Sequence, residues 1–196
     1  DGRAFDLDEA SRTRRYLDVR GTASTMSDLF YVKGMLAAAE LLGDAEKMRQ
    51  AKAYFRQIIA DIEAGTFAGE GVNFDPKVNR RPVPGRTSHG ARMIALGACA
   101  LFARCFPAED EWFERGARFT RYILDRHVNL GQFPELQPHE MFEFADAGGR
   151  PWREPGGAVL SDPGHSTEFA GLAAKFLLEL EKRPNKTAEQ DALLEK

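Results

Sequence analysis

The chain has 196 residues, of which 43% are hydrophobic and 29% are charged, so it is long enough to bury a core. Its 27 basic residues nearly balance its 30 acidic residues, and a net charge of -3 provides no broad positive field for a nucleic-acid backbone or an anionic membrane. No apolar run approaches the about 20 residues of a spanning helix, and the first residues, DGRAFDLDEA, do not resemble a signal peptide. We therefore expect a cytoplasmic globular protein that binds neither nucleic acid nor membrane.

Helical spacing of apolar residues dominates the chain and predicts five substantial helices followed by a short one. The first helix is expected to begin at Ser24 or Ser27 and to end at Gly43. The second begins at Asp44 and ends at Gly65, because aspartate caps helix starts and glycine stops helices. These two helices form a hairpin with a very short connection.

Two further helical hairpins are expected along the chain. The second hairpin pairs a helix over residues 88–105 with a helix over residues 109–127. The third begins near Gly164, breaks at Pro184 and resumes near Thr187. The order of helix, tight turn, helix and long loop therefore occurs three times, which predicts an all-α fold.

The long connections are residues 66–87 and 128–163. Because each hairpin reverses the chain direction, both connections should lie at one end of the stack, beside the starts of the next helices. The second connection contains strand-like pieces such as GQFPELQPHEMFEF followed by the turn ADAGGRP, so we expect short β-hairpins there. We expect a cleft at this end of the molecule.

Two histidines occupy equivalent places at the starts of successive hairpins, His89 and His165. Glu168 lies three residues after His165, which places the two side chains on one helical face. A helix N-terminus disfavours an imidazolium, so His165 is expected to be neutral and able to accept a proton. Glu168 is expected to orient the ring or to accept a hydrogen bond from a substrate hydroxyl. Arg86 and Arg92 flank His89 and are candidates to hold hydroxyls or an anionic group. The structural alternative is that these residues are ordinary helix caps and surface charges.

The remaining histidines and the cysteines carry weaker signals. His127 is expected at a helix C-terminus, where the dipole favours a partly cationic ring, and His139 in a loop. Cys99 and Cys105 fall on different faces of one helix, too far apart for a disulfide, and are expected to be reduced core residues.

The local patterns offer little support for a metal or a nucleophile. One H-x-x-E pair supplies two ligands, whereas catalytic zinc sites usually have three protein ligands and structural sites have four. No second ligand pair has a recognisable spacing, so we expect no metal, and nothing indicates another cofactor. Ser88 and Ser166 adjoin the histidines, but neither lies in a G-x-S-x-G nucleophile elbow.

The loop after residue 128 suggests a different chemistry, because two carboxylates suffice for glycoside hydrolysis. Its acidic residues are Glu135, Glu140, Glu143, Asp146, Glu154 and Asp162. Phe133, Phe142, Phe144 and Trp152 are candidates for a sugar-stacking platform, although packing of the loop onto the helices is the simpler use for at least two of them. A glycoside hydrolase or lyase with an (α/α)6 fold is therefore one alternative function, and a non-catalytic helical scaffold is another.

Two segments, SDLFYVKGMLAAAELLGD (27–44) and DPGHSTEFAGLAAKFL (162–177), with DAGGRPW between them, resemble the N-acylglucosamine 2-epimerase family. This family includes cellobiose 2-epimerases and mannose-type aldose-ketose isomerases. Its fold is an (α/α)6 barrel of six helical hairpins. The resemblance implies that residues 1–196 form a single α/α-toroid domain that is only about half of such a barrel. The chain is then a fragment, or a half-barrel that completes itself by association, for example as a homodimer.

The resemblance also implies an activity. In this family an open-chain sugar loses its C2 proton in a central cleft and is then reprotonated. His165 matches the catalytic histidine of the P-G-H-x-x-E segment, and Glu168 matches its companion glutamate. His89 resembles a histidine at the start of the preceding inner helix, with Arg86, Arg92 and Trp152 expected near a small-molecule sugar substrate. The sequence leaves epimerisation and isomerisation both open.

Overall fold

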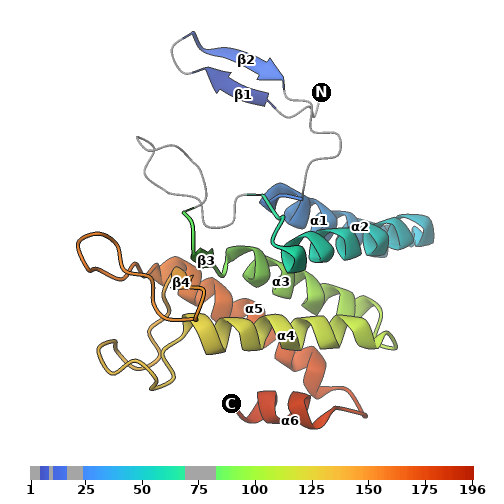
Figure 1. The fold of residues 1–196 in the computed structure, drawn as a ribbon. Helices are drawn as coiled ribbons and strands as arrows, with labels where there is room; N and C mark the ends of the chain where they lie inside the picture. The colour runs from blue at the N-terminus through green and yellow to red at the C-terminus, as the bar shows by residue number, and fades with distance from the viewer. Residues whose placement is uncertain (1–4, 9–10, 17–23, 69–82) are drawn as a thin grey trace.

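The computed structural model describes residues 5–8, 11–16, 24–68 and 83–196, and these residues are mostly helical (Figure 1). The expected five long helices and one short helix are confirmed. None of the helices in this described part has the length and apolarity of a membrane span. The elements are β1 (Phe5–Asp8), β2 (Thr13–Tyr16), α1 (Met26–Leu42), α2 (Ala45–Ala64), β3 (Arg86–Ser88), α3 (Gly90–Cys105), α4 (Asp110–His127), β4 (Phe144–Asp146), α5 (Pro163–Glu181) and α6 (Ala188–Glu195).

The start of α1 differs slightly from the expected serine cap. Thr25 is the N-cap, because the Asp28 carboxylate accepts hydrogen bonds from both the backbone N–H and the hydroxyl of Thr25, each at 2.7 Å. Ser24 instead donates its backbone N–H and its hydroxyl to Asp61 near the end of α2, at 2.9 and 2.5 Å. Ser24 therefore links the start of α1 to the end of α2.

Helix α3 is the centre of the fold and contacts α1, α4 and α5. It is buried on nearly all sides, as expected for an apolar helix without a polar face. Its Phe102 ring lies between Phe55 of α2 and Trp112 of α4, with ring centroids 4.8 and 4.7 Å away. Both cysteines are free, and Cys99 is a buried core residue as expected, whereas Cys105 is only half-buried at the end of α3. The core thus joins the first two hairpins.

The first helices of the three hairpins lie side by side, since α3 contacts both α1 and α5. The second helices, α2, α4 and α6, pack against their own partners. Figure 1 shows α1, α3 and α5 beginning near the end of the molecule that carries β3 and β4. The expected placement of the 128–163 connection beside the helix starts is therefore confirmed. Residues 69–82 of the other long connection lie outside the described residues.

The strands at this end pair differently from the expected loop hairpin. β4 lies in the 128–163 connection, but it pairs antiparallel with β3, which precedes α3. Within the connection there are isolated bridges, Ala145 with Pro151 and Arg153 with Val159. The last pair of this ladder joins Ser88 to Phe144. His89 directly follows Ser88 and Glu143 directly precedes Phe144, so the strand pairing brings His89 and Glu143 together.

The N-terminal β1–β2 hairpin was not expected from the sequence. The two strands pair in antiparallel register from Phe5 with Tyr16 to Asp8 with Thr13. Helical periodicity starts only after this segment, and its strands are short, with four residues each. A short strand pair with few apolar residues gives a weak pattern.

Candidate functional site

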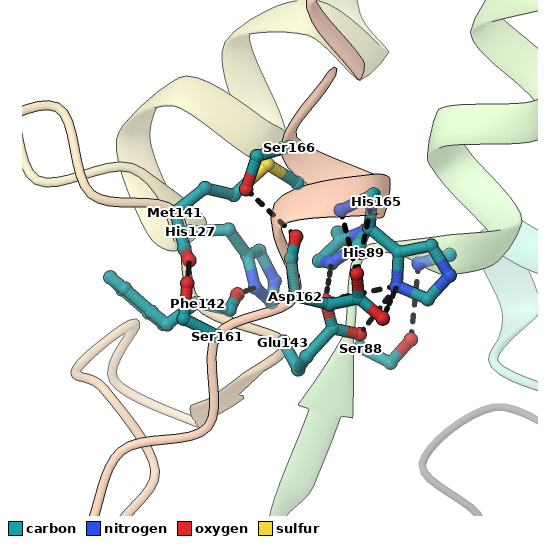
Figure 2. A network of polar contacts seen from close by, with 12 residues as sticks. Ser88, His89, His127, Met141, Phe142, Glu143, Ser161, Asp162, His165 and Ser166 are labelled. Carbon is teal, nitrogen blue, oxygen red and sulfur yellow. Dashed lines mark hydrogen bonds and ion pairs between the residues drawn. The ribbon is translucent and has the colours of Figure 1, made fainter. Parts of the chain in front are cut away.

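Three side chains from separate segments meet at the β3–β4 end of the molecule (Figure 2). His89 is the N-cap of α3, Glu143 immediately precedes β4, and His165 lies in the first turn of α5. Asp162 caps α5 by accepting hydrogen bonds from the backbone N–H groups of Gly164 and His165 at 2.7 and 3.3 Å. Strand pairing thus places His89 beside Glu143, and the helix cap fixes the segment that carries His165.

The Glu143 carboxylate is the common partner of both histidines. Nδ1 of His165 lies 3.0 Å from each carboxylate oxygen, and Nε2 of His89 lies 3.4 Å from one of them. The two imidazole rings are 5.8 Å apart between centroids and are nearly perpendicular, at 79°. An ionised carboxylate only accepts hydrogen bonds, so Nδ1 of His165 and Nε2 of His89 are assigned as the protonated nitrogens.

The three groups differ in their access to solvent. His89 is 1% exposed and the Glu143 side chain is 7% exposed, whereas the His165 side chain is 40% exposed. The carboxylate is therefore enclosed, and His165 is the member of the cluster that a dissolved molecule can reach.

Charge interactions within the cluster oppose the effect of burial. Burial alone would raise the pKa of Glu143, but hydrogen bonds from His89 and His165 outweigh it and the pKa is lowered. Burial alone would lower the pKa of His165, but the hydrogen bond and the charge of Glu143, followed by the charge of Asp162, raise it. The expected preference for a neutral His165 ring is therefore wrong in direction, because the Glu143 and Asp162 carboxylates outweigh burial and raise the pKa of His165.

His127 lies behind His89, with the two ring centroids 5.2 Å apart. Its Nδ1 lies 3.1 Å from the carbonyl oxygen of Phe142, to which it donates, and the residue is fully buried. Burial, followed by the charge of His89, lowers the pKa of His127 to about 3. The expected partly cationic ring at this helix end is therefore wrong, because burial of the His127 side chain strongly favours the neutral ring.

We expect His127 to make the protein sensitive to acid. A group whose pKa falls from about 6.5 in the unfolded chain to about 3 in the folded chain contributes stability that is complete above about pH 6.5 and is lost as the pH falls toward about 3. Between about pH 7 and about pH 5 this loss amounts to about 2 kcal/mol. Urea unfolding at both pH values measures it. The loss of unfolding free energy between the two pH values should be smaller in His127→Gln than in the parent protein. His139→Gln changes an exposed loop residue and should show the same loss as the parent protein. Equal losses in the parent protein and both variants would contradict the assignment.

The arginines predicted for the site have structural partners. Arg86 is buried with its guanidinium 3.9 Å from the Phe144 ring centroid, and its Nη1 lies 3.3 Å from the Glu154 carboxylate. Arg92 lies with its guanidinium 4.1 Å from the Tyr122 ring centroid and donates to the Ile62 carbonyl at 3.4 Å. Arg86 thus links β3 to the 128–163 connection, and Arg92 links α3 to α2 and α4. A role of either arginine in substrate binding stays a prediction.

The other two predicted residues lie close to the site but outside the cluster. Glu168 is exposed on α5 and acts on His165 through its charge, while the orienting contact expected from it is made by Glu143. Trp152 is half-buried, and its backbone N–H donates to the Phe144 carbonyl at 2.9 Å. A role for Glu168 in accepting a hydrogen bond from a substrate hydroxyl and a stacking role for Trp152 stay predictions.

Most of the loop carboxylates make hydrogen bonds or ion pairs within the protein that account for them structurally. Asp146 accepts from the backbone N–H groups of Gly148 and Arg150 in a turn, and Glu135 pairs with Arg153 at 3.1 Å. Phe142 and Phe144 are buried, which confirms that packing uses two of the loop aromatics. Among the loop carboxylates, Glu143 is the one that contacts both His89 and His165.

A hollow of about 590 Å³ lies between α1, α3 and α5. Its lining residues come from α1, α3 and α5 and are Lys33, Gly97, Ala100, Leu101, Arg104, Leu172, Lys175, Leu178, Glu179 and Lys182. Leu172 is two helical turns after His165 and therefore on the same face of α5. The hollow thus runs away from the cluster along this face, and it is not enclosed by the loops, where we expected a cleft.

The expectation of no metal depended on ligands that are neighbours in sequence. Glu143 is 54 residues from His89 and 22 residues from His165, so spacing alone gave no sign of the cluster. One ligand atom from each of the three side chains lies within 4.8 Å of the others. Two imidazoles and one carboxylate are a ligand set that suits zinc and related ions.

No protein-family model matches the chain, and comparisons with curated proteins and with solved structures found no significant match.

Proposed function

We propose that the chain is a sugar epimerase or isomerase of the N-acylglucosamine 2-epimerase type, in which His165 moves a proton at C2 of an open-chain aldose. The observation that carries this proposal is the contact of a partly exposed imidazole with a buried carboxylate, at 3.0 Å, beside a second imidazole. General bases are recognised by such geometry, in which one ring nitrogen is anchored and the other is free to act.

The hydrogen bond to Glu143 determines which nitrogen of His165 can accept the C2 proton. Because Nδ1 donates to Glu143, a neutral His165 ring has its lone pair on Nε2. Nε2 can take the C2 proton of an aldehyde-form sugar. The electron pair of the broken C–H bond forms the C1=C2 double bond of an enediolate, and the carbonyl electron pair moves to O1. Return of a proton to C2 from the other face gives the epimer, and return to C1 gives the ketose.

Glu143 supports both protonation states of His165. Its negative charge stabilises the imidazolium that forms when the proton is taken, and its hydrogen bond fixes the orientation of the ring. The lowered pKa of Glu143 keeps it ionised, so it is poorly suited to be the general acid of a glycoside hydrolase. The cluster therefore favours histidine proton transfer over hydrolysis through this carboxylate.

The proposed fold, cellular location and substrate also depend on the resemblance to the N-acylglucosamine 2-epimerase family. We propose that the three helical hairpins belong to an (α/α)6 barrel or form about half of one, with α1, α3 and α5 as inner helices. Their side-by-side arrangement and the site at their N-terminal ends support this assignment. We also propose that the protein is cytoplasmic and that its substrate is a small sugar.

Hydrogen exchange at C2 tests the proposed function directly. The full chain is incubated in D2O with simple, N-acylated and disaccharide aldoses, and the C2–H signal of each sugar is followed by proton NMR. We expect one class of aldose to lose this signal while its epimer or its ketose accumulates, because the proton that Nε2 takes up exchanges with solvent. Release of new reducing ends from an oligosaccharide without C2 exchange would reject the proposal in favour of a hydrolase.

A further inference from the structure

We propose that His89, Glu143 and His165 form a binding site for one divalent transition-metal ion of the zinc type. The three side chains supply two imidazole nitrogens and a carboxylate oxygen, all within 4.8 Å of one another. This set of three protein ligands is one that catalytic zinc sites use, with a water molecule in the fourth position.

Two of the three separations between ligand atoms are close to those around a tetrahedral ion. Zinc lies about 2.0–2.2 Å from nitrogen and oxygen ligands, which separates neighbouring ligand atoms by about 3.4 Å. The Glu143 carboxylate lies 3.4 Å from Nε2 of His89 and 3.0 Å from Nδ1 of His165. The ligand nitrogens of the two histidines lie within 4.8 Å of each other, and around one ion this separation would shorten to about 3.4 Å.

Burial favours a metal at this place. His89 and Glu143 are buried, so their positions are held by packing before any ion arrives, while the exposed side of His165 provides an entry path and an open coordination position. Among the described residues, Nδ1 of His89 is buried and has no hydrogen-bond partner. When Nε2 of His89 binds a metal, the proton of the neutral ring must be carried by Nδ1.

Metal binding also changes the nitrogen that the proposed function uses, and this step rests on that function. If a metal occupies Nδ1 of a neutral His165, the ring proton must be carried by Nε2. Nε2 then has no lone pair with which to take a C2 proton. Bound metal should therefore inhibit C2 proton exchange, and a chelator should restore it.

Cobalt(II) absorption tests the binding without any assay of activity. The full chain is titrated with CoCl2 and then with ZnCl2, and we expect one equivalent of Co2+ to give intense tetrahedral-type bands that Zn2+ removes. His165→Ala changes a partly exposed residue and Glu143→Gln keeps the side-chain shape, so both should fold, as judged by circular dichroism. We expect each to weaken Co2+ binding at least about 10-fold, since each removes a ligand or its charge. His139→Ala, in an exposed loop, should bind like the parent protein.

The outcomes separate the two proposals. A parent protein without tetrahedral bands, or a His165→Ala variant that binds Co2+ as tightly as the parent, would overturn the metal site whatever the activity. Binding together with chelator-reversible inhibition of C2 exchange supports both proposals. Binding with unimpaired exchange would keep the metal site and reject His165 as the base.

Discussion

Replacing His165 by asparagine is expected to lower kcat for C2 proton exchange at least about 100-fold, because a positioned acid or base contributes about 10²- to 10⁴-fold. Asparagine can still hydrogen-bond to Glu143, but it has no nitrogen that accepts a proton. The His165 side chain is 40% exposed, so the fold should tolerate the change. The deuterium-exchange assay measures kcat, and circular dichroism confirms folding.

Two companion variants make this result specific. His139→Asn changes an exposed loop histidine and should leave kcat unaltered. Glu143→Gln removes the charge that raises the pKa of His165, so the rise of kcat/KM with pH should move to lower pH. A merely structural role for Glu143 would lower activity without moving the pH profile. Near-normal kcat in folded His165→Asn would refute the proposed mechanism.

The helices could be predicted because their signals are local. Asp44 caps α2 by accepting from the Lys47 backbone N–H, and Gly43 and Gly65 end α1 and α2 with positive φ angles of 68° and 71°. Each of these signals lies within a few residues of the boundary that it fixes. The Thr25 cap was missed because Ser24, Thr25 and Ser27 are all good caps, and only the contact of Ser24 with Asp61 excludes that serine.

The candidate site could be predicted only in part, because its partners are distant in sequence. His89 and His165 were found from their equivalent places at helix starts, and the structure brings their rings to 5.8 Å. Glu143 was one of six loop carboxylates with no distinguishing spacing. Its place beside His89 depends on the pairing of Ser88 with Phe144, which joins two segments that are far apart in the chain. Glu168 was chosen as the partner because helical spacing was the signal the sequence contained.

The packing of α4 against α5 leads to the second large expected effect, on stability. Gly116 of α4 faces the ring of Phe176 of α5, which is fully buried. A methyl group at Gly116 would overlap that ring, with the ring atoms Cδ2 and Cζ only 2.6 Å away. Alanine improves helix propensity by about 1 kcal/mol, but overpacking a tight core costs about 1–3 kcal/mol or more. We expect Gly116→Ala to lower the unfolding free energy by about 2 kcal/mol, measured by urea unfolding.

Gly171 on α5 provides the matched control, because it is exposed and a methyl group on its Cα would meet nothing within 4 Å. Gly171→Ala keeps the gain in helix propensity without the overlap, so it should raise the unfolding free energy by about 0.5–1 kcal/mol. Changes of opposite sign in the unfolding free energy of Gly116→Ala and Gly171→Ala would show that the contact with Phe176 causes the loss. If Gly116→Ala is as stable as the parent protein, α4 and α5 are not packed as closely as the structure has them. Phe176→Ala in the Gly116→Ala background provides a second check, since the overlap and its cost disappear with the ring and the two changes should not be additive.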